Sequence, residues 1–124
     1  MSVEQLIRGQ AHRASVSHDL GDITGFLAEQ LGHKLTAYLA GGNDPKAVTA
    51  WARGSRHPRA EVERRLRAAY QVFILLQSGD SEDTVRSWFI GMNPQLDDRA
   101  PAEVLREDDL REVLAAAQAY LAGG

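Results

Sequence analysis

Basic side chains gather in one stretch of the sequence, where their chemistry suits the binding of nucleic acid. Residues 44–58 read DPKAVTAWARGSRHP and include the cations Lys46, Arg53 and Arg56. Residues 34–67 carry eight basic and three acidic side chains, although the chain of 124 residues has a formal net charge of −3. Because lysine and arginine neutralise phosphates, this stretch predicts contact with a polyanion. The alternative is a chance segregation of solvated charges.

Acidic side chains dominate the last part of the chain. Residues 68–124 have a net charge of −6. Glu107, Asp108, Asp109 and Glu112 surround the start of the last apolar segment, and they would complement a basic cleft on a partner. Their alternative role is helix capping or simple solvation. The opposite charges of the two parts indicate two partners of opposite character.

No combination of residues in the sequence suits catalysis or metal binding. The chain has no cysteine, which excludes disulfides and Cys-ligated zinc. His18 and Asp19 are metal-ligand types, but no second such pair follows at helical spacing. Asp108 and Asp109 are adjacent, and adjacent positions of a helix do not face each other. We therefore expect no enzyme, no catalytic residue, no bound metal and no cofactor.

Helices must position these residues, because apolar side chains recur at intervals of three and four. Sustained period-two alternation is missing, so no strand is predicted and the fold class is all-α. Residues 1–20 are weakly patterned and are expected to form a flexible arm or a loose helix. Helices are expected at about residues 22–31, 34–40, 45–53 and 59–77, after Ser81, at 101–106 and from about Asp108 onward.

The basic stretch has the layout of a helix-turn-helix, in which two short helices flank a glycine-containing turn. Asp44 is a suitable N-cap, and Pro45 fits the first position of the second helix. That helix must pack one face and leave the other for the major groove. Val48 and Trp51 fall on the packed face. The opposite face carries Lys46, Thr49, Ala50 and Arg53, with Arg56 and Arg59 following for phosphate contacts.

The turn itself departs from the usual spacing of the motif. Counted back from Val48, the positions that normally hold alanine and glycine are Tyr38 and Gly42. The turn is therefore one residue longer than usual, and the sequence leaves the angle between the two helices open.

Two motifs in this order resemble a known family. The pattern P-K-A-V-x-x-W-x-x-G-x-x-x-P, residues 45–58, is similar to the helix-turn-helix of the Xre/MbcA/ParS-like antitoxins. The later sequence resembles the toxin-binding domain of that family, with Trp88, then Asn93-Pro94-x-Leu96, then Pro101-x-x-Val104-Leu105 and a final amphipathic helix. The resemblance covers about residues 22–124.

The resemblance implies an antitoxin of a type II toxin-antitoxin system. Such a protein binds a RES-domain toxin that degrades NAD, covers the active site of that toxin, and represses its own operon by binding double-stranded DNA. The domains would be a flexible arm at 1–20, a helix-turn-helix domain at 21–79 and a toxin-binding domain at 80–124. The toxin contacts would come from the last helix and the end of the chain: Leu110, Val113, Leu114, Ala117, Tyr120, Leu121, Gly123 and Gly124.

The expected setting is the cytoplasm, with a homodimer inside a larger toxin-antitoxin complex. No apolar run approaches the roughly 20 residues of a membrane span, and the first residues lack the pattern of a signal peptide. Two alternatives stay open. The chain could be a stand-alone transcriptional regulator without a toxin, or an interaction module whose DNA-binding half has decayed.

Overall fold

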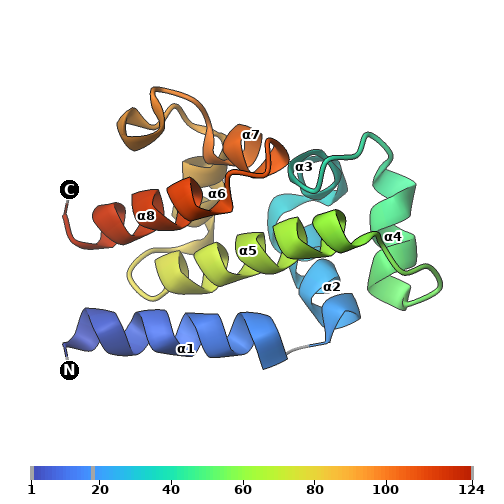
Figure 1. Cartoon of the computed structure of the whole chain (residues 1–124), viewed down its shortest axis with the longest axis horizontal. Helices are drawn as coiled ribbons and strands as arrows, with labels where there is room; N and C mark the ends of the chain where they lie inside the picture. The colour runs from blue at the N-terminus through green and yellow to red at the C-terminus, as the bar shows by residue number, and fades with distance from the viewer. Residues whose placement is uncertain (1, 18, 124) are drawn as a thin grey trace.

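The computed structural model describes residues 2–17 and 19–123, and for residues 15–17 the backbone alone. The described residues form eight α-helices, one short 3-10 helix and no β-strand, so the predicted all-α class is confirmed (Figure 1). None of these helices combines the length and the apolar character needed to cross a membrane. The elements are α1 (Val3–Ser17), α2 (Leu20–Leu31), α3 (His33–Leu39), α4 (Pro45–Arg53), α5 (Ala60–Gln77), α6 (Glu82–Ile90), η1 (Pro94–Leu96), α7 (Pro101–Arg106) and α8 (Leu110–Leu121).

Several helices begin or end where the sequence supplies a capping group. The Asp44 carboxylate accepts a hydrogen bond from the backbone N–H of Lys46 at 2.9 Å, and Pro45 occupies the first position of α4. The Ser81 hydroxyl accepts from the backbone N–H of Thr84 at 3.3 Å at the start of α6. Gly54 ends α4 with a φ of 74°, a left-handed conformation that glycine adopts without strain.

The hydrophobic core is centred on α5, which packs most extensively against α1, α8 and α2 (Figure 1). Phe73 of α5 is fully buried. Its ring meets Phe26 of α2 edge-on at 5.2 Å and stacks with Phe89 of α6 at 6.2 Å. One hydrophobic cluster therefore includes residues from both sides of the expected boundary between residues 79 and 80.

Residues 3–17 form a helix that packs against the core, which is the helical one of the two alternatives expected for residues 1–20. Helix α1 lies along α5, and its Ala11 is only 1% exposed (Figure 1). Ile7, Ala11 and Ala14 recur at intervals of four and three, and all three pack into the core. Small side chains let two helices approach closely, so this face is buried although it carries little apolar surface.

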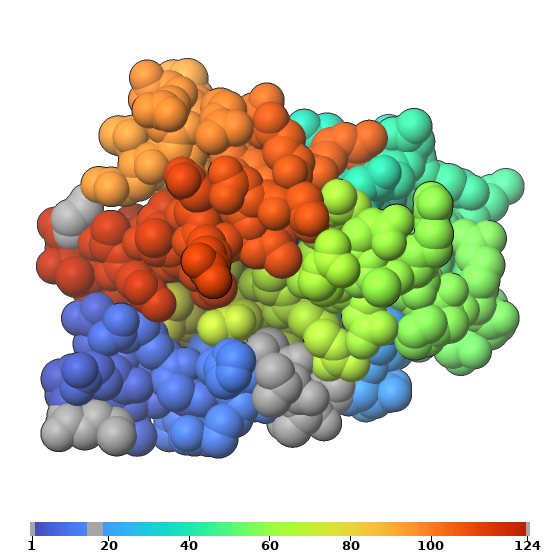
Figure 2. Space-filling model, in the orientation of Figure 1, coloured from blue at the N-terminus to red at the C-terminus, as the bar shows by residue number. Residues whose placement is uncertain are grey.

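The two ends of the molecule carry the two regions to which binding roles are assigned. Helix α4 forms one end, and the last turns of α8 lie at the other, beside the first turn of α1 (Figure 1). The space-filling view shows the same separation between the green surface of α4 and the red surface of α8 (Figure 2). The residues expected from the sequence to bind DNA and those expected to bind a toxin therefore lie far apart on the molecule.

Candidate functional site

Helix α4 has one buried face and one face open to solvent. Val48 is fully buried and Trp51 is 8% exposed, which confirms the prediction that Trp51 belongs to the core. This face packs against α2 and α3. The opposite face consists of the four residues predicted for it: Lys46 and Arg53 are exposed, and Thr49 and Ala50 are half-buried.

Glycines in α2 hold the C-terminal end of α4 in close contact. A Cβ atom at Gly21 would lie 2.9 Å from the backbone carbonyl oxygen of Ala52, closer than side-chain carbons approach in proteins. A Cβ atom at Gly25 would lie 4.0 Å from the Cβ atom of Ala52. Because Gly21 has no side chain, the first turn of α2 lies directly against the last turn of α4.

The connection between α3 and α4, residues 40–44, begins with a hydrogen-bonded C-terminal cap of α3. Gly41 has a φ of 98° and donates to the carbonyl of Tyr38 at 3.0 Å, while Gly42 donates to the carbonyl of Ala37 at 2.8 Å. This is the hydrogen-bond pattern of a Schellman motif, which requires a left-handed residue after the cap. The long turn expected from the sequence is thus a defined structure.

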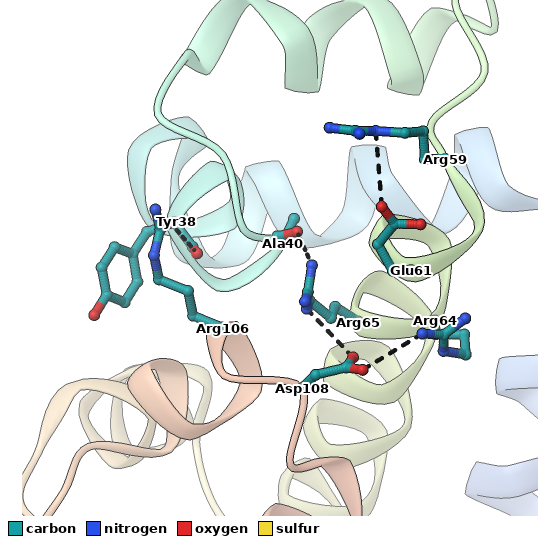
Figure 3. Close-up of polar contacts among 8 residues, drawn as sticks. All are labelled: Tyr38, Ala40, Arg59, Glu61, Arg64, Arg65, Arg106 and Asp108. Carbon is teal, nitrogen blue, oxygen red and sulfur yellow. Dashed lines mark hydrogen bonds and ion pairs between the residues drawn. The ribbon is translucent and has the colours of Figure 1, made fainter.

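Arg56 and Arg59 lie on a flank of α4 and not on its open face. Both line a hollow between the α3–α4 connection and the start of α5, and the same hollow is lined by Ala47 and Trp51 from the buried side of α4. Arg59 also lies 3.7 Å from the Glu61 carboxylate (Figure 3). The six predicted DNA contacts therefore form a central group of four and a flanking pair.

Fewer positive charges in this region are free of internal ion pairs than the sequence count implies. Arg64 and Arg65 both pair with Asp108 at 3.4 Å, and Arg67 pairs with Glu63 at 2.9 Å. In contrast, three cations of α4 and its following loop make no ion pair within the described residues. These cations are Lys46, Arg53 and Arg56.

Glu63 connects the loop after α4 to α5. The hydrogen bond from Arg67 lowers the pKa of Glu63 below its ordinary value, and His57 at 3.3 Å contributes to the same shift. Arg67 and His57 therefore favour the ionised carboxylate, which ties the exposed loop to the first turns of α5.

The residues of α8 and the chain end that are expected to bind the toxin differ in how far they are buried. Val113 and Ala117 are fully buried, so their surface is already used in the core of this chain. Leu110, Leu114 and Leu121 are half-buried and pack against the same core. Tyr120 and Gly123 are exposed, and Gly124 lies outside the described residues.

An exposed apolar surface beside α8 was not predicted. Trp88, Met92, Pro94 and Tyr120 line a hollow between the end of α6 and α8, and we call these four residues the Met92 patch. Met92 is 82% exposed and the nearby Ile90 is 58% exposed. The sequence does contain a signal for this surface, since the run WFIGM at 88–92 holds more apolar residues than one helical face can bury.

Some polar side chains of the C-terminal part make contacts within the protein, and others do not. A hydrogen bond to the Asp80 carboxylate raises the pKa of Tyr120, which couples the patch to the start of α6. Arg99 pairs with Glu107 at 2.8 Å. Asp109 and Glu112 are exposed and make no ion pair within the described residues.

The open face of α4 combines positive charge with small side chains. Two exposed cations flank two small side chains on one helical face, and no three His, Asp or Glu side chains in the described part of the chain group as metal ligands. Small side chains let a helix backbone come close to a polymer surface, and lysine and arginine are the side chains that most often contact phosphates. No protein-family model, no curated protein and no solved structure matches this chain.

Proposed function

We propose that this protein is a DNA-binding antitoxin, in which α3, the connection at 40–44 and α4 act as a helix-turn-helix. The observation that carries this proposal is the division of α4 into a buried face and an open cationic face. A recognition helix needs this division, because it must be anchored to its own protein while its outer face enters the major groove.

The residues of α4 take distinct roles in this proposal. Lys46 and Arg53 contact base edges or phosphates from the two ends of the open face, and the methyl groups of Thr49 and Ala50 meet thymine methyl groups. Arg56 and Arg59 contact backbone phosphates on the flank. Two copies of the chain would read two half-sites about one helical turn apart.

The C-terminal part takes the partner role that the resemblance implies. We place the contact with a RES-domain toxin on the Met92 patch, which includes Tyr120, and on the adjoining edge of α8. We assign Val113 and Ala117 to the core. Asp109 and Glu112 complement a basic cleft on that partner. An apolar centre with a charged rim is the usual anatomy of a specific protein interface.

The DNA proposal is tested by fluorescence anisotropy with a labelled duplex taken from the region immediately upstream of the gene. A duplex of the same length and composition but scrambled order is the control. We expect tighter binding to the upstream duplex, and a lower affinity for the Lys46→Ala and Arg53→Ala variants. Equal binding to both duplexes, or none at low salt, would remove DNA reading from the proposal.

The antitoxin proposal is tested by co-expression with the RES-domain protein expected to be encoded beside the gene. Met92→Glu should abolish rescue of growth without unfolding the chain, since Met92 is almost fully exposed. Gln77→Glu places the same charge on an exposed residue outside the patch and should rescue like wild type. Lys46→Ala should also rescue, because neutralisation does not need DNA.

Deleting the chain after Asp109 is a second arm of the same experiment. The truncation should fail to rescue, but it also removes the buried residues Val113 and Ala117, so the Met92 variant decides which surface matters. Rescue by the truncated chain would contradict the assigned surface. DNA binding without rescue by the wild type would leave a stand-alone regulator.

A further inference from the structure

Backbone carbonyls around the α3–α4 connection accept hydrogen bonds from an arginine of the C-terminal part. Arg106, the last residue of α7, donates from Nη1 to the carbonyls of Tyr38 and Gly42, each at 2.8 Å. Its Nη2 donates to the Asn43 side chain at 3.2 Å, and its guanidinium lies 4.7 Å above the Tyr38 ring. Figure 3 shows Arg106 reaching from α7 to the end of α3.

A second arginine supports the same connection from α5. Arg65 donates from Nη1 to the carbonyl of Ala40 at 3.2 Å, and its Nε lies 3.4 Å from the Asp108 carboxylate (Figure 3). Its side chain is only 16% exposed. A Cβ atom at Gly41 would lie 2.6 Å from Nη1 of Arg65, so the missing side chain at Gly41 leaves the space that the guanidinium occupies.

The corner between α7 and α8 is built to present these groups. Asp108 follows α7 with a φ of 69° and donates to the carbonyl of Leu105 at 2.9 Å, while Asp109 donates to the carbonyl of Val104 at 3.2 Å. This closes α7 with a Schellman motif directly after Arg106. A single corner therefore supplies Arg106 to the connection and Asp108 to Arg65.

The contacts of Arg106 fix the start of α4. They fall on both sides of Gly41 and end at Asn43, the residue before the Asp44 cap. The carbonyls lie at the C-terminal, negative end of α3, where a cation is favourable. The close contact of Gly21 with Ala52 fixes the other end of α4. The helix is thus held at one end by α2 and at the other by an arginine more than 50 residues away.

We propose that Arg106 is a positioning residue for DNA binding: it holds the connection that sets the angle and register of α4, without touching DNA itself. The C-terminal part is then a structural component of the DNA reader. This inference rests on the proposed DNA-binding function. A lysine cannot fully replace Arg106, because an ammonium lacks the second nitrogen that reaches Asn43 and the flat face that covers the Tyr38 ring.

The test compares Arg106→Lys with Arg99→Lys in the full-length chain, using the upstream duplex described above. Both substitutions preserve charge, and both remove a guanidinium that is held within the protein. Arg99 contacts Glu107 and the carbonyl of Leu96, and within the described residues it does not contact the α3–α4 connection. Affinity is measured over a range of salt concentrations, at a temperature where circular dichroism shows both variants folded.

We expect Arg106→Lys to raise Kd about five- to tenfold, the change that corresponds to the loss of one net hydrogen-bonded contact. The slope of log Kd against log salt should stay at the wild-type value, since no phosphate contact is removed. Backbone amides of residues 41–47 should exchange with deuterium faster than in wild type, whereas those of α8 should not. Arg99→Lys should bind DNA like wild type.

Two results would overturn the positioning role. One is an Arg106→Lys variant that binds the upstream duplex as tightly as wild type, and the other is an equal loss of affinity for Arg99→Lys, which would indicate general destabilisation. A wild-type chain that binds no duplex would instead refute the DNA-binding function, and the positioning role with it. The behaviour of the wild type therefore separates the two failures.

Discussion

Trp51 is a packing residue at the centre of the candidate DNA reader. It is buried between α4 and its neighbours, while Lys46 and Arg53 leave the same helix on the other side. We expect Trp51→Ala to lower the free energy of unfolding by about 3–5 kcal/mol, the usual cost of truncating a buried aromatic side chain. Urea unfolding followed by circular dichroism measures this, with Trp51→Phe as a milder control. Unchanged stability combined with lost DNA binding would show that Trp51 contacts the ligand instead.

The salt dependence of DNA binding should show whether the cations of α4 contact phosphates. If Lys46 or Arg53 contacts a phosphate, its replacement by alanine lowers the slope of log Kd against log salt by about one. Arg111→Ala removes the same charge from an exposed position of α8 and is the matched control. An equal change for Arg111 would mean that binding responds to net charge, with no defined role for α4.

Glu63 should make the stability of the molecule depend on pH. Its pKa is lowered in the folded chain mainly by the hydrogen bond from Arg67. The contribution is therefore complete above the ordinary pKa of a glutamate and is lost as the pH falls through the lowered value. Between about pH 6 and about pH 3, the melting temperature of wild type should fall more than that of Glu63→Gln. Parallel curves for the two proteins would contradict this role.

At the scale of elements, most helices could be predicted because each carries a local signal. Asp44 and Pro45 start α4, Gly54 ends it, Ser81 starts α6, and Pro101 starts α7. These signals act within a few residues, so they can be recognised without knowledge of the fold. The open face of α4 could be predicted for the same reason, since its spacing is a property of one helix.

Other features depend on contacts between distant parts of the chain and could not be predicted. Helix α1 is held by small residues such as Ala11, whose burial depends on α5 and gives little pattern of its own. The contact of Arg106 with Gly42 joins residues that are 64 positions apart. The burial of Val113 and Ala117 follows from packing against the rest of the core, and their spacing alone equally suits a partner surface.

The connection between α3 and α4 should be sensitive to the space at Gly41. Gly54→Ala places a Cβ atom in open surroundings at a φ of 74°, and it should cost about 1 kcal/mol from the left-handed backbone alone. Gly41→Ala should cost more in urea unfolding, because the Cβ atom also displaces the Arg65 guanidinium. Equal costs for the two variants would show that Arg65 moves away freely and does not support the connection.

The whole molecule places its two candidate interfaces at opposite ends of a single core. Helix α5 joins them, since Phe73 contacts Phe26 of α2, the helix that packs against α4, and also Phe89 of α6, whose ring contacts Trp88 of the Met92 patch. Arg106 and Asp108 add polar contacts from the C-terminal part to α3 and α5. Residues of the expected domains at 21–79 and 80–124 therefore share one packed core.

We expect the chain to unfold in one cooperative transition, because a shared core cannot lose one half and keep the other. The two tryptophans allow a direct test, since Trp51 reports on α4 and Trp88 on the C-terminal part. Trp88→Phe and Trp51→Phe each leave one fluorophore, and in each variant the fluorescence midpoint in urea should coincide with the midpoint by circular dichroism. If Trp88 changed its environment at a lower urea concentration than the loss of helix, the C-terminal part would unfold separately. Arg106 could then not act as a constant support for the DNA reader, and residues 80–124 would be an independent domain.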